Sequence, residues 1–129
     1  MTYDQFMEAL CLWREARGAS MPAKQGVLSV IRNRVADKRF PNTSAGVIVQ
    51  PWQFSSFNDS DPNSKRWPLP GPEWQAWLDC LAVVNAPLGG DPTDGATNYE
   101  SLPDGMAKPK WADEAKFTCK IGPFSFYRL

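Results

Sequence analysis

Hydrophobic side chains recur every three or four residues over two segments near the start of the chain, residues 3–16 and about 22–37. This period is typical of amphipathic helices. In the first segment the apolar stripe consists of Tyr3, Phe6, Met7, Leu10 and Trp13. Thr2 and Gln5 have the spacing of a capping box, and Gly18 is a natural stop. We therefore expect a helix over residues 3–16.

The second segment has Pro22 in its first turn, as helix starts often do. Its inner face is predicted to be Val27, Val30, Ile31, Arg34 and Val35. A third helix should begin at Pro72 and end near residues 85–87. Its apolar face is predicted to be Trp74, Trp77, Leu78, Leu81 and Val84.

The remaining segments indicate strands and loops. Residues 46–50, "GVIVQ", form a short β-branched run typical of a strand, and "PWQFSSF" after it is typical of a loop or strand edge. Residues 58–72 contain four prolines and predict a long loop, which in a compact domain tends to be functional or mobile. The last segment, "FTCKIGPFSFYRL", alternates around Gly122–Pro123 and predicts a hairpin. We expect a single α+β domain over residues 1–129, mainly helical with a few short strands.

Composition narrows the function classes. With 129 residues, 43% of them hydrophobic, the chain can bury a core, and 14 basic and 14 acidic residues balance to zero net charge. The basic run at residues 32–39 is therefore a weak nucleic-acid signal, and we interpret it as a solvated face or as arginines that tie down the long loop. No apolar run approaches the roughly 18 residues of a membrane span. We expect no nucleic-acid partner, no membrane insertion and a monomer.

The chain contains no histidine. This count excludes a Ser-His-Asp triad, a Cys-His pair and the usual imidazole zinc sites. The three cysteines are widely spaced, without a CxxC pair, and are expected to be buried reduced thiols. We expect no metal and no cofactor, so the acid–base groups of an enzyme with this sequence would be carboxylates.

Glu15, in "LWREARG", is the first such carboxylate. It falls in the predicted last turn of its helix, where the macrodipole disfavours a negative charge, and this position beside Trp13 should raise its pKa. Arg14 and Arg17 act in the opposite direction, and spacing alone favours an exposed glutamate paired with an arginine. A raised pKa requires that both guanidinium groups point away, Arg17 toward the backbone or Asp37.

Three stretches interleave aromatic and polar residues in the way that sugar-binding sites do: 52–57 "WQFSSF", 97–101 "TNYES" and 124–129 "FSFYRL". Buried aromatic strands with polar residues facing water explain them equally well. A two-carboxylate glycosidase would also need an acid opposite Glu15. The candidates, each of which could instead be a turn former, are Asp59, Asp61, Asp91, Asp94, Glu100 and Asp104.

In order along the chain, four blocks resemble the SleB-type cell wall hydrolase family, named for spore cortex-lytic enzymes. The blocks are "LWREARG", "GVLSVIRNRVADKRFPNTSAGVIVQPWQFSSF", "DPTDGATNYES" and "PKWADEAKFTCKIGPFSFYRL", and they span about residues 9–128. The resemblance implies a lysozyme-like fold and cleavage of peptidoglycan glycan strands between N-acetylmuramic acid and N-acetylglucosamine. It also implies that Glu15 is the catalytic acid. The substrate-binding residues that it implies are Gln53, Phe54, Ser55, Asn98, Tyr99, Phe126 and Tyr127.

Two positions depart from the family pattern. The family usually has histidine where this chain has Asn98, and commonly another where it has Phe124. Asn98 can still donate and accept hydrogen bonds, whereas Phe124 can only pack. Because Glu15 is intact, these departures weaken the assigned contacts in the cleft more than the assigned reaction.

The resemblance favours a lytic transglycosylase over a hydrolytic muramidase, with Tyr99 or Tyr127 orienting Glu15. A module that binds peptidoglycan without cutting it is the alternative. Because "MTYDQFMEAL" does not resemble a signal peptide, we expect a phage or prophage endolysin. Such a protein would be made in the host cytoplasm and would reach the wall after holin-type release.

Overall fold

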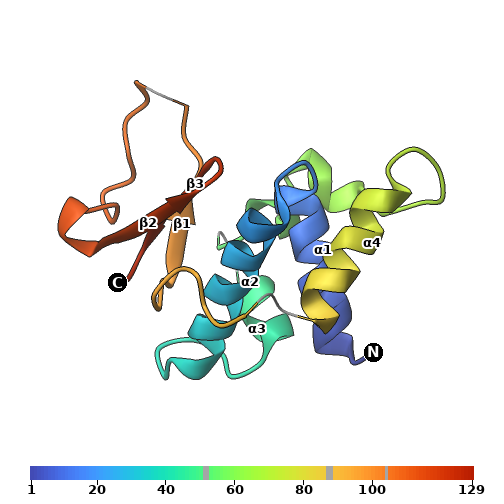
Figure 1. The fold of residues 1–129 in the computed structure, drawn as a ribbon, viewed down its shortest axis with the longest axis horizontal. Helices are drawn as coiled ribbons and strands as arrows, with labels where there is room; N and C mark the ends of the chain where they lie inside the picture. Colours follow the sequence, from blue (N-terminus) through green and yellow to red (C-terminus); the bar gives the residue numbers. More distant parts are fainter. Residues whose placement is uncertain (51–52, 87–88, 104) are drawn as a thin grey trace.

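The computed structural model describes residues 1–50, 53–86, 89–103 and 105–129. Helices come first along the chain and a small sheet comes last (Figure 1). The elements are α1 (Tyr3–Ala16), α2 (Met21–Ala36), α3 (Ser44–Ile48), the 3-10 turns η1 (Ser55–Phe57) and η2 (Pro62–Lys65), α4 (Trp74–Asn85), β1 (Asn98–Glu100), the 3-10 turn η3 (Glu114–Lys116), β2 (Phe117–Ile121) and β3 (Phe124–Tyr127). The expected mainly helical α+β class is confirmed.

Helix α1 is the centre of the helical part and packs against α2, α3 and α4. Both hydrogen bonds of the predicted capping box form, since Gln5 N donates to Thr2 Oγ1 and Thr2 N donates to Gln5 Oε1. Leu10 and Trp13 are almost completely buried, as predicted, whereas Tyr3 at the open first turn is exposed. Burial of this stripe supplies most of the stability that a single helix lacks.

Helix α2 connects the helical part to the sheet. Ser20 caps its start, Pro22 lies in the first turn, and the predicted inner face is buried except for the half-buried Val35. A side chain at Gly26 would place its Cβ 2.6 Å from Cζ of Phe126. The glycine therefore lets strand β3 lie directly against the helix.

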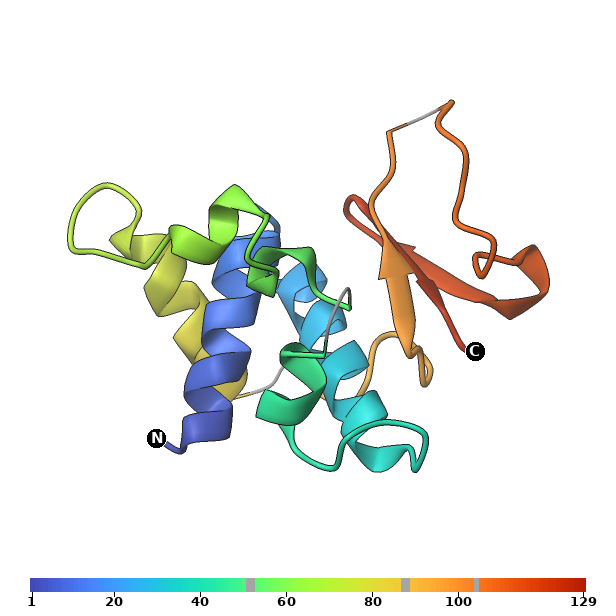
Figure 2. The ribbon, with the colours of Figure 1, turned by 180° about the vertical axis from the view of Figure 1, so that it is seen from behind.

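The sheet is antiparallel with strand order β1-β3-β2. The predicted hairpin is confirmed, because β2 and β3 pair across a tight turn in which Gly122 has φ of 57°. In β1, Tyr99 lies opposite Phe126, which brings two of the aromatic blocks together. Figures 1 and 2 show the sheet, together with the loop that connects β1 to β2, beside the helices on one side of the molecule.

Three expectations about the helices and loops were wrong. The run expected as a strand at residues 46–50 lies mostly in α3, since Thr43 caps a helix there that buries both Val47 and Ile48. Helix α4 begins at Trp74, after Pro72, and Leu78 lies on its exposed side. The described part of the next block, residues 53–57, is a turn followed by η1, so the loop alternative agrees with the structure and the strand edge does not, and Pro51 and Trp52 lie outside the described residues.

The third concerns the loop at residues 58–72, because the interpretation in which arginines of residues 32–39 tie down this loop is wrong. Arg14 holds this loop instead, since it donates to the carbonyls of Ser64 and Arg66.

No helix in the described segments is long and apolar enough to cross a membrane.

Candidate active site

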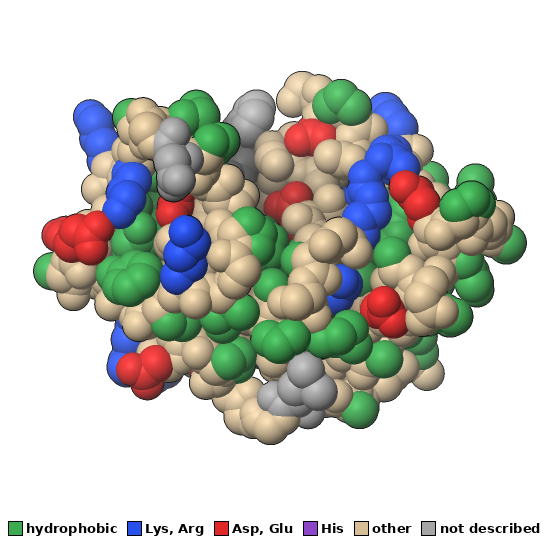
Figure 3. Space-filling model, turned by 45° about the horizontal axis from the view of Figure 1, so that its top comes forward, with side chains coloured by type: hydrophobic (Ala, Val, Ile, Leu, Met, Phe, Trp, Pro, Cys, Tyr) green, Lys and Arg blue, Asp and Glu red, His purple; other side chains and the backbone are tan. Residues whose placement is uncertain are grey.

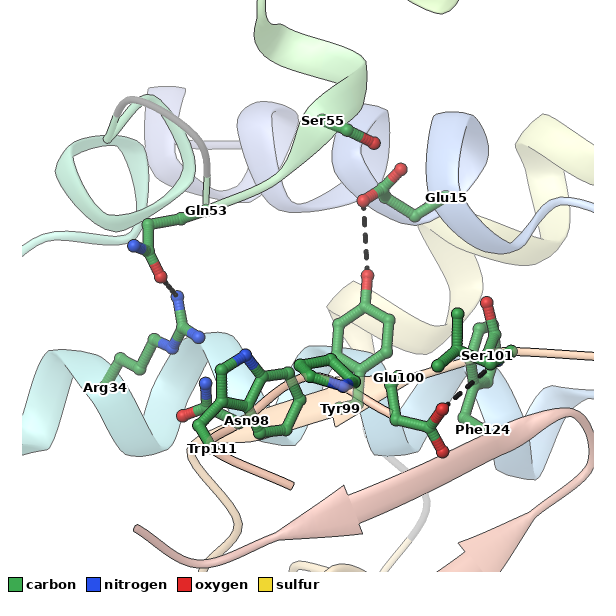
Figure 4. Close-up of a pocket in the computed structure, with 12 residues that line it drawn as sticks. Glu15, Arg34, Gln53, Ser55, Asn98, Tyr99, Glu100, Ser101, Trp111 and Phe124 are labelled. Carbon is green, nitrogen blue, oxygen red and sulfur yellow. Dashed lines mark hydrogen bonds between the residues drawn. The ribbon is translucent and has the colours of Figure 1, made fainter. Parts of the chain in front are cut away.

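A cavity of about 460 Å³ opens between the helices and the sheet. Figure 3 shows this face hollowed, with an acidic side chain inside the hollow. Figure 4 shows the cavity with its lining residues as sticks. The lining residues are Glu15, Arg34, Gln53, Ser55, Asn98, Tyr99, Glu100, Ser101, Leu102, Pro109, Trp111 and Phe124.

Glu15 projects into this cavity from the last turn of α1 and is half-buried. Burial raises the pKa of its carboxyl above the usual range, because the charged form loses hydration. The nearby Ser56 and Tyr99 hydroxyls lower this pKa, and the negative charge of Asp61 raises it, with a net shift upward. The Ser56 hydroxyl is buried and forms no well-aligned hydrogen bond with a described residue. The site therefore shifts the Glu15 carboxyl toward its protonated form, which is the state that a general acid needs.

The neighbouring arginines both point away from Glu15. Arg14 donates to the carbonyls of the loop, and its guanidinium lies 4.8 Å from the centre of the Trp67 ring. Arg17 donates to the Trp13 carbonyl (3.2 Å) and stacks on the same residue's ring. The expected orientation is confirmed, with Arg17 directed to the backbone.

The alternative direction for Arg17 is wrong, because Asp37 pairs with Arg39. Within the described part of the chain, no arginine or lysine forms an ion pair with Glu15. The raised pKa of Glu15 is therefore not cancelled by a salt bridge.

Tyr99 faces Glu15 from strand β1 (Figure 4). Its hydroxyl donates to Glu15 Oε1 at 3.2 Å. Aromatic neighbours fix the ring, with centroid distances of 5.3 Å to Phe124, 6.1 Å to Phe126 and 6.3 Å to Phe54. Burial raises the pKa of Tyr99 far above its ordinary value, so the phenol stays neutral and acts as a donor. Tyr99 is thus the tyrosine that orients Glu15.

The other predicted tyrosine lies elsewhere. Tyr127 is completely buried and packs edge-on against Trp111 and Phe117. Phe54 and Phe126 are also buried, the latter under Gly26. These three residues do not line the cavity, so their assignment as direct substrate contacts is corrected to a packing role beneath it. Gln53, Ser55, Asn98 and Tyr99 do line it, as their assignment requires.

Sequence reasoning missed several lining residues. Arg34 was predicted only as part of a helix face, and Trp111 and Pro109 carried no periodic signal because they lie in an irregular loop. Phe124 lines the cavity as well as packing against Tyr99. Trp111 is half-buried and offers an aromatic surface at the cavity wall.

Among the candidate second carboxylates, Glu100 lines the cavity, and one of its oxygens accepts from Leu102 N at 3.2 Å. Asp61 acts on Glu15 through its charge but does not line the cavity. Asp91 organises a turn by accepting from Thr93 and Gly95. Asp59 and Asp94 do not line the cavity, and Asp104 lies outside the described residues.

The described residues contain no group of three or more cysteine, aspartate or glutamate side chains placed to hold a metal ion. The cavity instead combines one carboxyl of raised pKa with amides, hydroxyls and an aromatic surface. Such a set can transfer a proton and bind a hydroxylated, amide-bearing ligand.

A mainly helical domain that presents one such carboxyl opposite a small sheet defines the lysozyme-like class of folds. The chain belongs to the cell wall hydrolase family, whose model matches residues 18–127. That match begins after Glu15, so the role of Glu15 depends on the geometry described above.

Solved structures and a named protein that are similar to the chain support this membership. The catalytic domain of the germination-specific lytic transglycosylase SleB from Bacillus anthracis has a TM-score of 0.71 and 30% identity, covering 99% of this chain and 97% of that one. The Bacillus cereus SleB catalytic domain has a TM-score of 0.72, also with 30% identity, covering 97% of this chain and 89% of that one. A spore cortex-lytic enzyme from Bacillus cereus is 33% identical over 127 residues, 95% of this chain and 43% of that protein. The chain thus spans less than half of that relative's length.

Proposed function

We propose that this protein cleaves the glycan strand of peptidoglycan between N-acetylmuramic acid and N-acetylglucosamine as a lytic transglycosylase. The observation that carries the proposal is the state of the Glu15 carboxyl. It faces the cavity, its pKa is raised, and it accepts a hydrogen bond from the Tyr99 hydroxyl. Similarity to a lytic transglycosylase catalytic domain over nearly the whole chain supports the same reaction.

In the first step, protonated Glu15 donates its proton to the glycosidic oxygen as the bond breaks. The sugar then develops oxocarbenium character, and its own N-acetyl oxygen can stabilise the positive carbon, as in substrate-assisted glycosidases. Glu15 leaves this step as a carboxylate. The neutral Tyr99 hydroxyl stabilises that charge by a hydrogen bond and keeps the carboxylate in position.

In the second step, the Glu15 carboxylate removes the proton of the C6 hydroxyl of the same sugar. The C6 oxygen attacks the anomeric carbon, a 1,6-anhydro ring closes, and Glu15 is protonated again. One residue thus serves as acid and then as base, which suits a chain without histidine.

Hydrolysis is the second candidate, and the position of Glu100 favours it. Glu100 lines the same cavity, and Figure 4 shows it on the wall across from Glu15. A second carboxylate there could activate water or stabilise the cation, giving a muramidase. In that case Glu100→Gln would abolish cleavage, whereas a transglycosylase would keep most of its activity.

The experiment uses purified protein and its Glu15→Gln variant on isolated peptidoglycan, with the soluble fragments weighed. The proposal expects fragments from wild type only, about 18 Da lighter than hydrolysis products because ring closure replaces water addition. Release that survives in the variant would exclude Glu15 as the acid. Binding without any fragments would favour the non-catalytic binding module.

The role as a phage or prophage lysis enzyme stays a prediction. Expression in a bacterial host with and without a holin would test it. Lysis that depends on the holin and on Glu15 is the expected result.

A further inference from the structure

The proposed reaction assigns no role to Arg34, the positively charged side chain among the described residues that line the cavity. Arg34 is 4% exposed yet lines the cavity, on the wall across from Glu15 in Figure 4. Its Nε donates to the Thr97 carbonyl at 2.6 Å, and its Nη1 donates to Gln53 Oε1 at 2.9 Å. The guanidinium also lies over the rings of Phe40 and Phe54, at 5.0 and 5.6 Å from their centres.

No carboxylate of the described residues pairs with Arg34. This distinguishes it from Arg32, two residues earlier, which pairs with Glu8. Burial lowers the pKa of Arg34, because the charged guanidinium loses hydration without a counter-charge. A buried cation that lacks a counter-charge and faces a cavity is suited to bind an anionic ligand.

Arg34 also determines which way Gln53 points. A guanidinium can only donate, so the Gln53 amide must turn its oxygen toward Arg34 and leave its NH₂ group for other partners. Gln53 is exposed, and its amide lies at the cavity wall. The third guanidinium nitrogen, Nη2, has no hydrogen-bond acceptor among the residues the structure describes. This corner of the cavity thus presents N–H donors.

We propose that Arg34 and Gln53 bind a carboxylate carried by the muramic acid side of the substrate, and so select strands that carry one near the cleaved bond. A carboxylate supplies two acceptor oxygens and the missing negative charge. Two groups of peptidoglycan have this chemistry: the lactyl carboxylate of peptide-free muramic acid, and the free carboxylates of its stem peptide. This inference rests on the proposed function for the substrate class.

The test measures binding in the Glu15→Gln background, so that no ligand is consumed. The ligands are peptide-free glycan tetrasaccharides with free lactyl carboxylates, the same tetrasaccharides with these carboxylates converted to methylamides, and tetrasaccharides with short stems whose carboxylates are free or amidated. Calorimetry at one ionic strength gives the four dissociation constants. One free-carboxylate ligand should bind about tenfold tighter than its neutral counterpart, and the pair that shows the difference identifies the source.

Two variants assign the preference to this corner. Arg34→Gln should bring the tenfold ratio close to one without weakening the neutral ligand. Gln53→Glu, at an exposed position, places a carboxylate beside Arg34 and should reject the charged ligand while keeping the neutral one. Arg39→Gln, which removes the same charge from an exposed ion pair outside the cavity lining, should leave the ratio at tenfold.

Equal binding of charged and neutral ligands would overturn the carboxylate proposal and leave the proposed function intact. If Arg34→Gln weakens the charged and the neutral ligand equally, Arg34 only holds Gln53 and Thr97 in place. That result would also overturn the carboxylate proposal. If none of the oligosaccharides binds, the proposed function fails, and the carboxylate site fails with it.

Discussion

Glu8 and Glu15 lie two turns apart on α1, and the protein treats them in opposite ways. Glu8 is 3% exposed and accepts two hydrogen bonds from Arg32, at 3.0 and 3.2 Å, and one from Ser44 at 3.0 Å. Glu15 is half-buried and accepts from a neutral phenol. The main partner of Glu8 is thus a cation, whereas the partner of Glu15 is a neutral hydroxyl.

This difference shows that the partner, more than burial itself, decides what a glutamate can do. The bidentate arginine gives the Glu8 carboxylate a counter-charge and joins α1 to α2, and the same Arg32 also donates to the Val84 carbonyl at the end of α4. At Glu15 burial raises the pKa, and no cation of the described residues pairs with the carboxyl, so it binds a proton more tightly than an ordinary glutamate at a position that faces the cavity. The first arrangement supports the fold, and the second is suited to chemistry.

The largest effect that tests this contrast is the loss of activity in Glu15→Gln. The amide has nearly the same shape but no proton to donate, so we expect peptidoglycan cleavage to fall by about 10³-fold or more. Muropeptide release, followed by chromatography, measures it. The matched control is Glu8→Gln, assayed well below its melting temperature, which should keep most of the activity. Equal loss of activity in both variants would break the comparison.

The second prediction concerns stability and Arg32. Arg32→Ala leaves the Glu8 carboxylate buried with only Ser44 as a partner, which should destabilise the fold by about 3 kcal/mol. Thermal unfolding measures the loss, expected as a fall in Tm of about 10 °C. Arg39→Ala, which breaks an exposed pair, should change Tm very little. If both variants unfold at the wild-type temperature, the Glu8–Arg32 pair does not stabilise the fold.

The third prediction removes only the Tyr99 hydroxyl. Tyr99→Phe keeps the ring in its aromatic cluster and should lower activity about tenfold, because the Glu15 carboxylate loses its donor. That hydrogen bond lowers the pKa of Glu15, so its loss should raise the pKa further. Since cleavage needs protonated Glu15, the alkaline limb of the pH–activity profile should move to higher pH. Tyr127→Phe, outside the cavity lining, is the control, and an identical alkaline limb in all three proteins would refute the role of Tyr99.

The sequence predicted those features of the fold and of the site that follow from local patterns. The 3.6-residue period and the Thr2 cap predicted α1, and the absence of histidine directed attention to Glu15. The alternation around Gly122 predicted the hairpin. These features depend on residues close together in the chain, where propensity and capping decide the structure.

The rest depends on contacts between distant segments. Spacing could not show that Glu8 meets Arg32 and Ser44, or that Arg34 reaches Gln53 and Thr97. Residues 46–50 were expected as a strand because β-branched residues favour strands, yet the Thr43 cap and burial on both sides favour a helix. Among the aromatic residues, composition could not tell Tyr99 at the cavity from Tyr127 in the core.

The smallest predicted effect is the pH dependence of stability that Glu15 creates. Because its folded-state pKa lies above the unfolded value of about 4.3, the folded protein binds more protons than the unfolded chain between these two pH values. Stability therefore falls as pH rises through that window, and Glu15→Gln escapes the fall. The melting temperature of Glu15→Gln minus that of wild type should increase from about pH 4 upward and level off above the raised pKa of Glu15. Glu8→Gln, which loses an ion pair, should instead melt below wild type at neutral pH. A Glu15→Gln difference that stays constant from acid to neutral pH would show that folding does not raise the pKa of the Glu15 carboxyl, and the contrast drawn at this residue would fail.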